Sequence, residues 1–505
     1  MLEQIDLTKK MEKEDYKEKI RTLEPVLARL QRECKELGIP VMIVFEGFGA
    51  SGKGLQINKL IHPLDPRGFK VFAIKQETEE EKMFPFLWRF WTKTPEKGRM
   101  AIFDTSWYRH VSVDRFEGNV SEKELDYAYQ EINTFEKTLT DDGTVIIKLF
   151  MHISKKEQKK RFDRLLAEKE TKWRVSKKDM ARNTGYKEYK AMLEEMLEKT
   201  ETEHSPWTII EATDRKFATV KILTTVIRCL QEQIEEKKRK EVVLSPETEA
   251  AEPAEAEPAA VLLESSTLSK VDLTLSYTKE EYKEKLKALQ KKMTVLHSEL
   301  YSRRIPVLLC FEGWDAGGKG GAIKRLTEAM DPRGYVVNPT AAPTLTEKNH
   351  HYLWRFWKDM PKAGHVAIFD RTWYGRVMVE RIEGFCSKEE WQRAYKEINH
   401  MEAHLAHSGA IVLKFWMHID KEEQERRFKE RMENPEKQWK ITEEDWRNRE
   451  KWDQYEEAVN EMIIRTSTSY APWIIVEGNS KYYARIKVLE TVVAAIEERL
   501  KKESD

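Results

Sequence analysis

The chain has 505 residues, more than one ordinary domain needs, and its 88 basic and 88 acidic side chains cancel to a formal net charge of zero. That balance excludes the broad basic surface of a nucleic-acid-coating protein, so binding of a polyanion would require a local cluster of basic residues. No apolar run approaches the roughly 18 residues of a membrane span, and the four cysteines form no CxxC pair. We therefore expect a cytoplasmic protein without a nucleic-acid or membrane partner.

The chain is a tandem repeat. VFEGFGASGKG at 44–54 returns as CFEGWDAGGKG at 310–320, and AIFDTSWY at 101–108 returns as AIFDRTWY at 367–374. Equivalent positions are 266 residues apart throughout, which indicates a duplicated domain rather than a stacked array of short repeats. We expect the copies at residues 5–236 and 267–505. Residues 237–266 between them are rich in Ala, Glu and Pro, which predicts a flexible linker or, alternatively, a partner-docking segment.

The second copy alternates strands with helices. Short apolar runs predict five buried strands, at residues 307–311, 335–337, 366–369, 410–417 and 474–476. Helical spacing of apolar and charged residues predicts helices at 280–302, 319–330 and 486–500. This order predicts an α/β domain with a five-stranded parallel sheet covered by helices on both faces. Ligands of such sheets bind beyond the carboxyl ends of the strands.

A glycine loop follows the first of these strands. GWDAGGKGG at 313–321 matches the GxxxxGK phosphate loop in the strand–loop–helix setting that the motif requires. Its backbone N–H groups and the following helix would hold phosphate oxygens, and Lys319 adds a point charge. The hydroxyl residue that normally follows the lysine and ligates Mg²⁺ is replaced by Gly320. Asp315 could ligate the metal instead, could orient and deprotonate an attacking phosphate oxygen, or could cap the loop.

The second motif is FDRTWYGR at 369–376. An apolar strand that ends in an aspartate is where such folds place a second metal-directed carboxylate, here Asp370. Arg371 and Arg376 flank it, and guanidinium groups suit non-bridging phosphate oxygens. Trp373 and Tyr374 could shape a base pocket or belong to the core, and the sequence favours the two interpretations equally.

Further basic residues follow in the second copy, although most charged side chains of a chain with 35% charged residues are merely solvated. They are Lys324, Arg325, Arg333, Lys348, Arg355, Arg381, Arg426, Arg427, Arg431, Lys437 and Lys440. Residues 422–446 are dense in charge at helical spacing, and we interpret them as a lid that closes over the phosphates and excludes water.

These motifs resemble the polyphosphate kinase 2 family, and the tandem arrangement resembles its two-domain members. The resemblance rests on FEGWDAGGKGG (311–321), DPRG (331–334), LWRFW (353–357), FDRTWYGRV (369–377) and KFWMHIDKEEQERRF (414–428). It implies a P-loop kinase fold like that of thymidylate kinase, a requirement for Mg²⁺ with Mn²⁺ as an alternative ion, and reversible transfer of a phosphoryl group from inorganic polyphosphate to AMP. ADP as acceptor, ATP as donor, and a non-catalytic polyanion-binding scaffold are the alternatives.

On this basis we expect three groups of site residues. The catalytic group is Asp315, Lys319, Asp370, Arg371 and Arg376, with Asp315 and Asp370 as the metal ligands. The polyphosphate-binding group is Gly313, Gly318, Gly320, Gly321, Lys324, Arg325, Arg333 and Arg427. The nucleotide-binding group is Arg355, Trp373, Tyr374, Arg381 and Glu383.

The two copies are not equivalent. Gly49 stands in the place of Asp315, Thr105 in that of Arg371, and His110 in that of Arg376, whereas Lys53 and Asp104 remain. Each missing group can change a transfer rate by orders of magnitude, so we expect the first copy to be weak or inactive. It would then bind phosphate through Lys53 or act as a scaffold. We further predict that the copies form an internal pseudo-dimer, with further homo-oligomerisation open.

Overall fold

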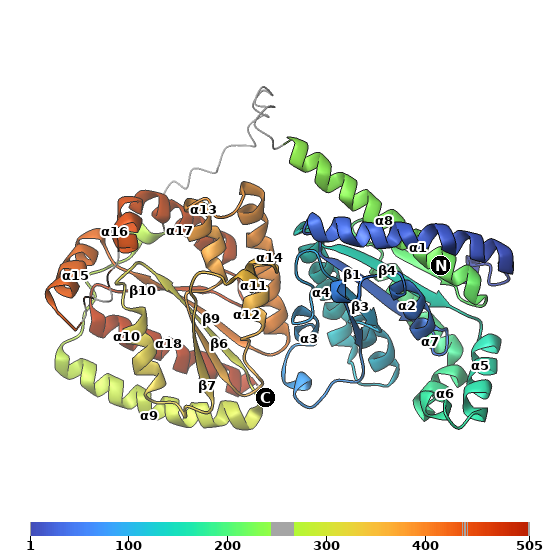
Figure 1. Cartoon of the computed structure of the whole chain (residues 1–505). Helices are drawn as coiled ribbons and strands as arrows, with labels where there is room; N and C mark the ends of the chain where they lie inside the picture. Colours follow the sequence, from blue (N-terminus) through green and yellow to red (C-terminus); the bar gives the residue numbers. More distant parts are fainter. Residues whose placement is uncertain (1, 244–266, 437, 439–440, 442, 503–505) are drawn as a thin grey trace. The chain divides into compact units, whose positions relative to one another are not determined.

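The chain folds into two compact units with the same architecture (Figure 1). The computed structural model describes residues 2–243, 267–436, 438, 441 and 443–502. The first unit contains most of the first repeat together with residues 345–351, and the second contains most of the second repeat together with residues 79–85. These two short segments occupy equivalent positions in the two repeats.

The first repeat builds a five-stranded parallel sheet with the strand order β2-β3-β1-β4-β5. Its strands are β1 (Val41–Gly47), β2 (Phe69–Ala73), β3 (Met100–Asp104), β4 (Val145–His152) and β5 (Trp207–Glu211). Its α-helices are α1 (Lys13–Glu36), α2 (Lys53–Ile61), α3 (Trp88–Trp91), α4 (Glu122–Asp141), α5 (Lys155–Ala167), α6 (Lys177–Thr184), α7 (Tyr186–Lys199) and α8 (Arg215–Val243).

The second repeat builds the equivalent sheet in the order β10-β9-β6-β8-β7. Its strands are β6 (Val307–Gly313), β7 (Tyr335–Pro339), β8 (Val366–Asp370), β9 (Ile411–His418) and β10 (Trp473–Glu477). Its helices are α9 (Lys279–Arg303), α10 (Lys319–Thr327), α11 (Leu345–Lys348), α12 (Trp354–Trp357), the 3-10 helix η8 (Trp373–Val377), α13 (Val379–Ile382), α14 (Lys388–His407), α15 (Lys421–Glu433), α16 (Glu443–Glu450), α17 (Trp452–Thr466) and α18 (Lys481–Lys502). The five strands predicted from the sequence are therefore confirmed.

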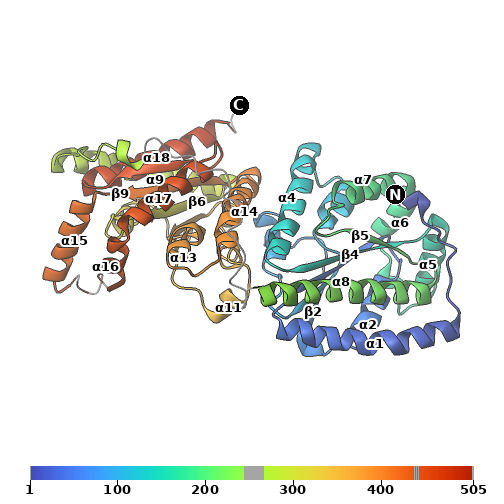
Figure 2. The same cartoon turned by 90° about the horizontal axis from the view of Figure 1, so that it is seen from above.

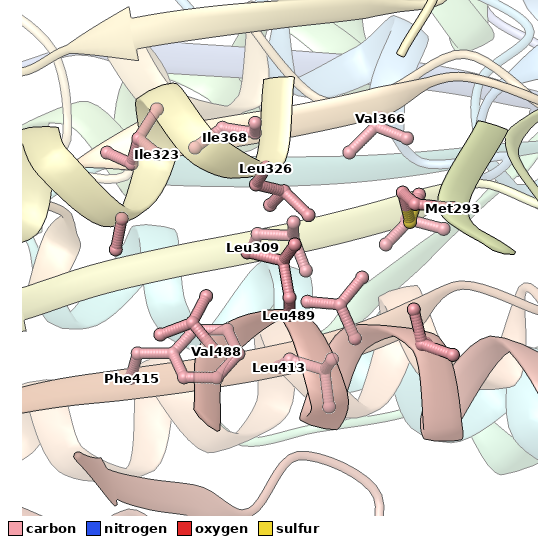
Figure 3. Close-up of a cluster of buried hydrophobic side chains, with 14 of the residues drawn as sticks. Met293, Leu309, Ile323, Leu326, Val366, Ile368, Leu413, Phe415, Val488 and Leu489 are labelled. Carbon is pink, nitrogen blue, oxygen red and sulfur yellow. The ribbon is translucent and has the colours of Figure 1, made fainter. Parts of the chain in front are cut away.

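Helices α9, α10 and α18 cover one face of the second sheet, and apolar side chains fill the space between the helices and the strands. Alternate residues of β6 and β9, such as Leu309 and Phe415, meet Leu326 of α10 and Leu489 of α18 in one buried cluster (Figure 3). Figure 2 shows α9 beside α18, and α1 beside α8 in the first unit. This cluster fixes the strand ends from which the functional loops depart.

The opposite face of the same sheet contains a buried charge pair. Lys414 points from β9 to Glu402 of α14 at 2.7 Å, and both side chains are 0% exposed. Lys414 also donates to the Thr466 carbonyl at 2.6 Å and to the Tyr374 hydroxyl at 2.8 Å. A buried charge is tolerated only when it is paired and hydrogen-bonded, and this network meets both conditions.

Three details differ from the sequence-based expectations. Helix α10 ends at Thr327 rather than at 330, because the Asp331–Pro332 step disfavours helical backbone. Residues 422–446 form parts of two helices, α15 and α16, because Asn434 before Pro435 is extended. Helix α8 continues through Val243, so residues 237–243 are helical rather than linker, and Lys240 and Glu236 form an i,i+4 pair there.

The remaining linker residues, 244–266, lie outside the described residues. Within the described part of the chain, no helix has the length and hydropathy needed to cross a bilayer. All four cysteines are free thiols.

Candidate active site

The glycine loop joins β6 to α10 and is shaped by backbone that only glycine adopts readily. Gly313 has φ +146°, and a Cβ there would lie 2.5 Å from the Met417 carbonyl oxygen. Gly318 caps α10 with φ +109°. The Lys319 ammonium folds back over the loop and donates to the Gly313 carbonyl at 2.9 Å. The loop therefore has the form of a phosphate cradle with its lysine in place.

Asp315 lies at the centre of the loop with its side chain 17% exposed. Its Oδ1 is 3.3 Å from Nη2 of Arg371, and its Oδ2 accepts from Nδ2 of Asn448 at 3.0 Å. Its backbone carbonyl accepts from the Gln424 side chain at 3.1 Å. The loop carboxylate is thus fixed from two sides by side-chain donors.

The second motif reaches the same place because β8 pairs in parallel with β6. Phe311 is in register with Asp370, and the Arg371 N–H donates to the Phe311 carbonyl at 3.0 Å. Arg371 has φ +67°, in the left-handed region of backbone conformation that residues other than glycine rarely adopt. Its side chain is 54% exposed. Asp370 ends the strand beside it. The two motifs, 56 residues apart, therefore form one site.

Glu312 clamps the two motifs together. Its Oε1 accepts from the backbone N–H of Thr372 at 2.6 Å and from the Thr372 hydroxyl at 2.8 Å. Burial raises the pKa of Glu312, and the charge of Lys319 opposes that rise. The clamp fixes the backbone next to Arg371, which explains how its left-handed conformation is maintained.

Arg376 follows one turn later. Its guanidinium carbon lies 4.5 Å from the centre of the Tyr352 ring, and its Nε is 3.2 Å from Glu380. The side chain is 15% exposed. A cation held between a ring and a carboxylate keeps one orientation, which suits a group that must neutralise phosphate charge.

Several residues predicted to bind substrate are engaged elsewhere. Arg427 is buried and donates to the carbonyls of Ala316 and Gly478, at 2.8 and 2.6 Å, so it supports the loop from behind. Arg381 pairs with Glu461 at 2.6 Å. Both contacts recur in the first repeat, where Arg161 donates to Ala50 and Arg115 pairs with Glu195.

The rest of the predicted set lies as follows. Glu383 pairs with Lys451 at 2.7 Å, Arg355 donates to the Ala341 carbonyl at 2.9 Å, Arg325 is 3.4 Å from Glu328, and Arg333 is 89% exposed and pairs with Asp331. Gly320 and Gly321 begin α10, and Lys324 is exposed on it. Lys437 and Lys440 lie outside the described residues.

Trp373 and Tyr374 belong to the core rather than to a base pocket. Both are almost fully buried, and both donate to Glu402, at 3.1 and 2.7 Å. Desolvation and the nearby Glu402 carboxylate raise the pKa of Tyr374, so its hydroxyl remains protonated. The rings anchor the arginine-bearing loop to the buried Lys414–Glu402 pair.

The first repeat preserves the scaffold of this site and changes its chemistry. Glu46 accepts from the backbone N–H and hydroxyl of Ser106, and Thr105 keeps φ +67°. His110 stacks on Phe86 at 4.3 Å, where the second repeat has the Arg376–Tyr352 contact. The backbone is therefore retained at Thr105, whereas His110 begins a π-helix (His110–Asp114) and Arg376 lies in the 3-10 helix η8.

The residues present also fit a hydrated Mg²⁺. Asp315 lies in the loop after β6, Asp370 ends the neighbouring strand β8, and Asp315 contacts Arg371, the residue after Asp370. No cluster of three or more His, Cys, Asp or Glu side chains suitable for a metal occurs among the described residues. Mg²⁺ is typically held by one or two carboxylates together with substrate phosphates and water. Asp315 and Asp370 fit this kind of site, and not one in which the protein alone supplies all the ligands.

Almost every group described at this site can hold or neutralise phosphate. Its lysine and its two arginines are cations, its backbone amides are donors, and its two carboxylates suit a metal ion. That balance defines the class of P-loop phosphotransferases, in which positioning and charge supply most of the catalysis.

Comparison with known proteins specifies the class further. The family model of polyphosphate kinase 2 matches residues 10–240 and again 276–504, so the chain belongs to the polyphosphate kinase 2 family. It is 40% identical to the polyphosphate:AMP phosphotransferase of Pseudomonas aeruginosa over 100% of both chains. It is 38% identical to the enzyme of the same name from Pseudomonas syringae pv. tomato over 98% of both. The crystal structure of a protein described as a polyphosphate kinase 2 from Pseudomonas aeruginosa superimposes with a TM-score of 0.85 at 38% identity, again over 100% of both chains.

Proposed function

We propose that this protein transfers a phosphoryl group reversibly from inorganic polyphosphate to AMP, giving ADP. The proposal is supported by the full-length similarity to two polyphosphate:AMP phosphotransferases. The observation that carries it is the convergence of Asp315, Lys319 and Arg371 on the glycine loop of the second repeat. That site offers cations and amides for a chain of phosphates and a carboxylate for the acceptor.

In the proposed reaction, an α-phosphate oxygen of AMP attacks the terminal phosphorus of polyphosphate. The bridging P–O bond breaks, and the shortened chain leaves. The acceptor phosphate is largely ionised at neutral pH, so little proton transfer is needed. The loop amides and Lys319 hold the transferring group, and Arg371 and Arg376 balance charge on its oxygens.

The two carboxylates orient the reactants. Asp315 and Asp370 would hold Mg²⁺, or Mn²⁺ in its place. The ion would neutralise phosphate charge at the loop. Asp315, fixed by Arg371 and Asn448, faces the loop in one orientation, so it can set the direction from which the acceptor oxygen approaches.

We assign the activity to the second repeat and a supporting role to the first. Gly49, Thr105 and His110 supply neither the loop carboxylate nor the two guanidinium groups. Lys53 lies 3.5 Å from the Gly47 carbonyl, so the first loop keeps its lysine and could still bind phosphate. The internal pseudo-dimer stays a prediction. We also propose a cytoplasmic location, which the four free thiols support.

A donor and acceptor assay on the purified full-length protein tests the function. We expect ADP from AMP and polyphosphate, and none from AMP when ATP replaces polyphosphate. Turnover with ATP alone would indicate an ordinary nucleotide kinase. Faster conversion of ADP to ATP than of AMP to ADP would reassign the acceptor, and polyphosphate binding without turnover would favour the scaffold.

A further inference from the structure

Helix α16 brings an uncharged side chain to the loop carboxylate. Asn448 donates from Nδ2 to Oδ2 of Asp315 at 3.0 Å, across 133 residues of sequence. The Tyr455 hydroxyl of α17 is 3.4 Å from Oδ1 of the same amide. A donor on the oxygen side of the amide indicates its orientation, with the NH₂ group toward Asp315.

The two oxygens of Asp315 have different partners. Oδ1 is 3.3 Å from the Arg371 guanidinium, and Oδ2 takes the neutral amide of Asn448. Two donors on opposite oxygens fix the plane of a carboxylate. Only one of the two donors is charged, so Asn448 orients the carboxylate without adding a second positive charge beside it.

The equivalent positions of the first repeat are arranged differently. Arg182 occupies the position of Asn448, and it bonds to Glu117 at 2.9 Å and to Asp179 at 2.6 Å. The position of Asp315 is Gly49, and the carboxylate beside that glycine is Asp179, whose Oδ1 lies 3.7 Å from where a Cβ on Gly49 would stand. The neutral amide thus accompanies a carboxylate of the loop itself in the second repeat, whereas an arginine takes its place where the loop has a glycine.

We propose that Asn448 is a positioning residue for Asp315. It holds the carboxylate in the orientation that the phosphoryl transfer uses, and it does so as a neutral donor. The proposal rests on the proposed function, because Asp315 acts only if the second repeat is the active site. A charged donor in this position would compete with the metal for the carboxylate.

The rank order of two variants separates positioning from packing. Asn448→Asp keeps the size of the side chain but replaces the donor with a negative charge beside Asp315. Asn448→Ala removes the donor and leaves space. If Asn448 positions Asp315, kcat falls about tenfold or more in Asn448→Ala, because a hydrogen bond to a charged group is lost. In Asn448→Asp it falls at least about tenfold further, because the new carboxylate also repels Asp315. KM for AMP and polyphosphate should change little.

A double-mutant cycle with Asp315→Asn tests the contact itself. The double variant carries the amide at position 315 and the carboxylate at position 448, so the donor and the acceptor exchange places and the hydrogen bond can form in reverse. In the Asp315→Asn background, Asn448→Asp should therefore no longer destabilise the protein or reduce its residual rate. Measured by denaturant unfolding of the full chain, the cycle needs no substrate. Arg182→Asn in the first repeat is the matched control, and it should leave turnover unchanged.

The outcomes are distinct. The proposal is supported if kcat is higher in Asn448→Ala than in Asn448→Asp and if the unfolding free energies show coupling between positions 315 and 448. A larger loss in Asn448→Ala than in the isosteric Asn448→Asp would assign a packing role and overturn it, and so would an unfolding cycle without coupling. If the wild-type protein does not turn over AMP and polyphosphate, the proposed function fails, while the unfolding cycle still decides whether Asn448 holds Asp315.

Discussion

The two repeats share a scaffold and differ in the charged side chains around the glycine loop. Each has a buried lysine–glutamate pair, Lys148–Glu136 at 2.9 Å in the first and Lys414–Glu402 at 2.7 Å in the second. Each also has the glutamate clamp and the arginine behind the loop. A contact that both repeats contain does not depend on Asp315, Arg371 or Arg376, which the first repeat lacks. The first repeat therefore shows which contacts of the second belong to the scaffold.

Backbone strain follows the scaffold rather than the chemistry. Thr105 and Arg371 both have φ +67°, although the left-handed region is particularly unfavourable for a β-branched residue such as threonine. The conformation persists at Thr105 without an arginine to display. The glutamate clamp and the strand register therefore determine this turn, and Arg371 makes use of it.

Among the exchanges of residues between the repeats, that of the loop residue should give the largest effect. Asp315→Gly copies the first repeat into the second, and we expect kcat/KM to fall about a thousandfold or more, because the carboxylate that faces the acceptor is lost. Gly49→Asp in the first repeat should leave turnover unchanged. Steady-state kinetics with AMP and polyphosphate measure both, and a loss below about tenfold for Asp315→Gly would remove this carboxylate from the mechanism.

Breaking the shared scaffold should affect both repeats alike. Glu402→Ala leaves the Lys414 ammonium buried without its counter-ion, and we expect a loss of about 3–5 kcal/mol in the free energy of unfolding. Glu136→Ala should cause a similar loss in the first unit. Denaturant unfolding followed by circular dichroism measures both losses. A loss below about 1 kcal/mol in either variant would contradict the structural role of these pairs.

A smaller effect is expected from Arg376→His, which introduces the residue of the first repeat. The imidazole can stack on Tyr352 as His110 stacks on Phe86, so the fold should be kept while a guanidinium is lost. We expect a fall of about a hundredfold in kcat, with an unchanged melting temperature. His110→Arg is the control. An active Arg376→His enzyme would show that stacking rather than charge is needed there.

The smallest effect is a dependence of stability on pH that both repeats share. Burial lowers the pKa of both His152 and His418 to about 4, and in the second repeat the Trp314 indole N–H donates to His418 Nδ1 at 3.1 Å. Above the unfolded pKa of about 6.5 neither state binds the proton, so no stability is lost. As the pH falls below about 6.5 the unfolded state binds it first, and stability falls.

Between about pH 7.5 and pH 5.5 we expect a loss of about 1 kcal/mol for each histidine. His418→Asn keeps an acceptor for Trp314 and should remove the contribution of the second repeat, as His152→Asn should remove that of the first. Denaturant unfolding at the two pH values measures the change. An unaltered pH dependence in both variants would rule out these histidines as its source.

The sequence predicts the strands well because each is a short apolar run bounded by glycine, proline or charge. It also predicts that the two motifs lie together, since both come at the carboxyl ends of strands that are neighbours in a parallel sheet. Helix ends are predicted less well. The charged residues on both sides of Asn434–Pro435 continue one helical pattern, but the proline makes Asn434 extended and ends α15 there.

Contacts between distant parts of the chain escaped sequence-based prediction. Asn448 lies in a charged segment with no local signal, and its partner is fixed only by the packing of α16. The roles of Trp373 and Tyr374 stayed open because their acceptor, Glu402, lies on a separate helix. Lys414 did carry a signal, since a lysine in the middle of a buried apolar strand requires a buried acidic partner.

We expect one repeat of the two to perform the chemistry. Lys319→Ala and Lys53→Ala remove the same ammonium group from the two glycine loops, so ADP formation by the two variants compares the loops directly. We predict that Lys319→Ala abolishes turnover of AMP with polyphosphate while Lys53→Ala retains most of it. Equal losses in the two variants, or a greater loss in Lys53→Ala, would contradict the assignment of a single active repeat.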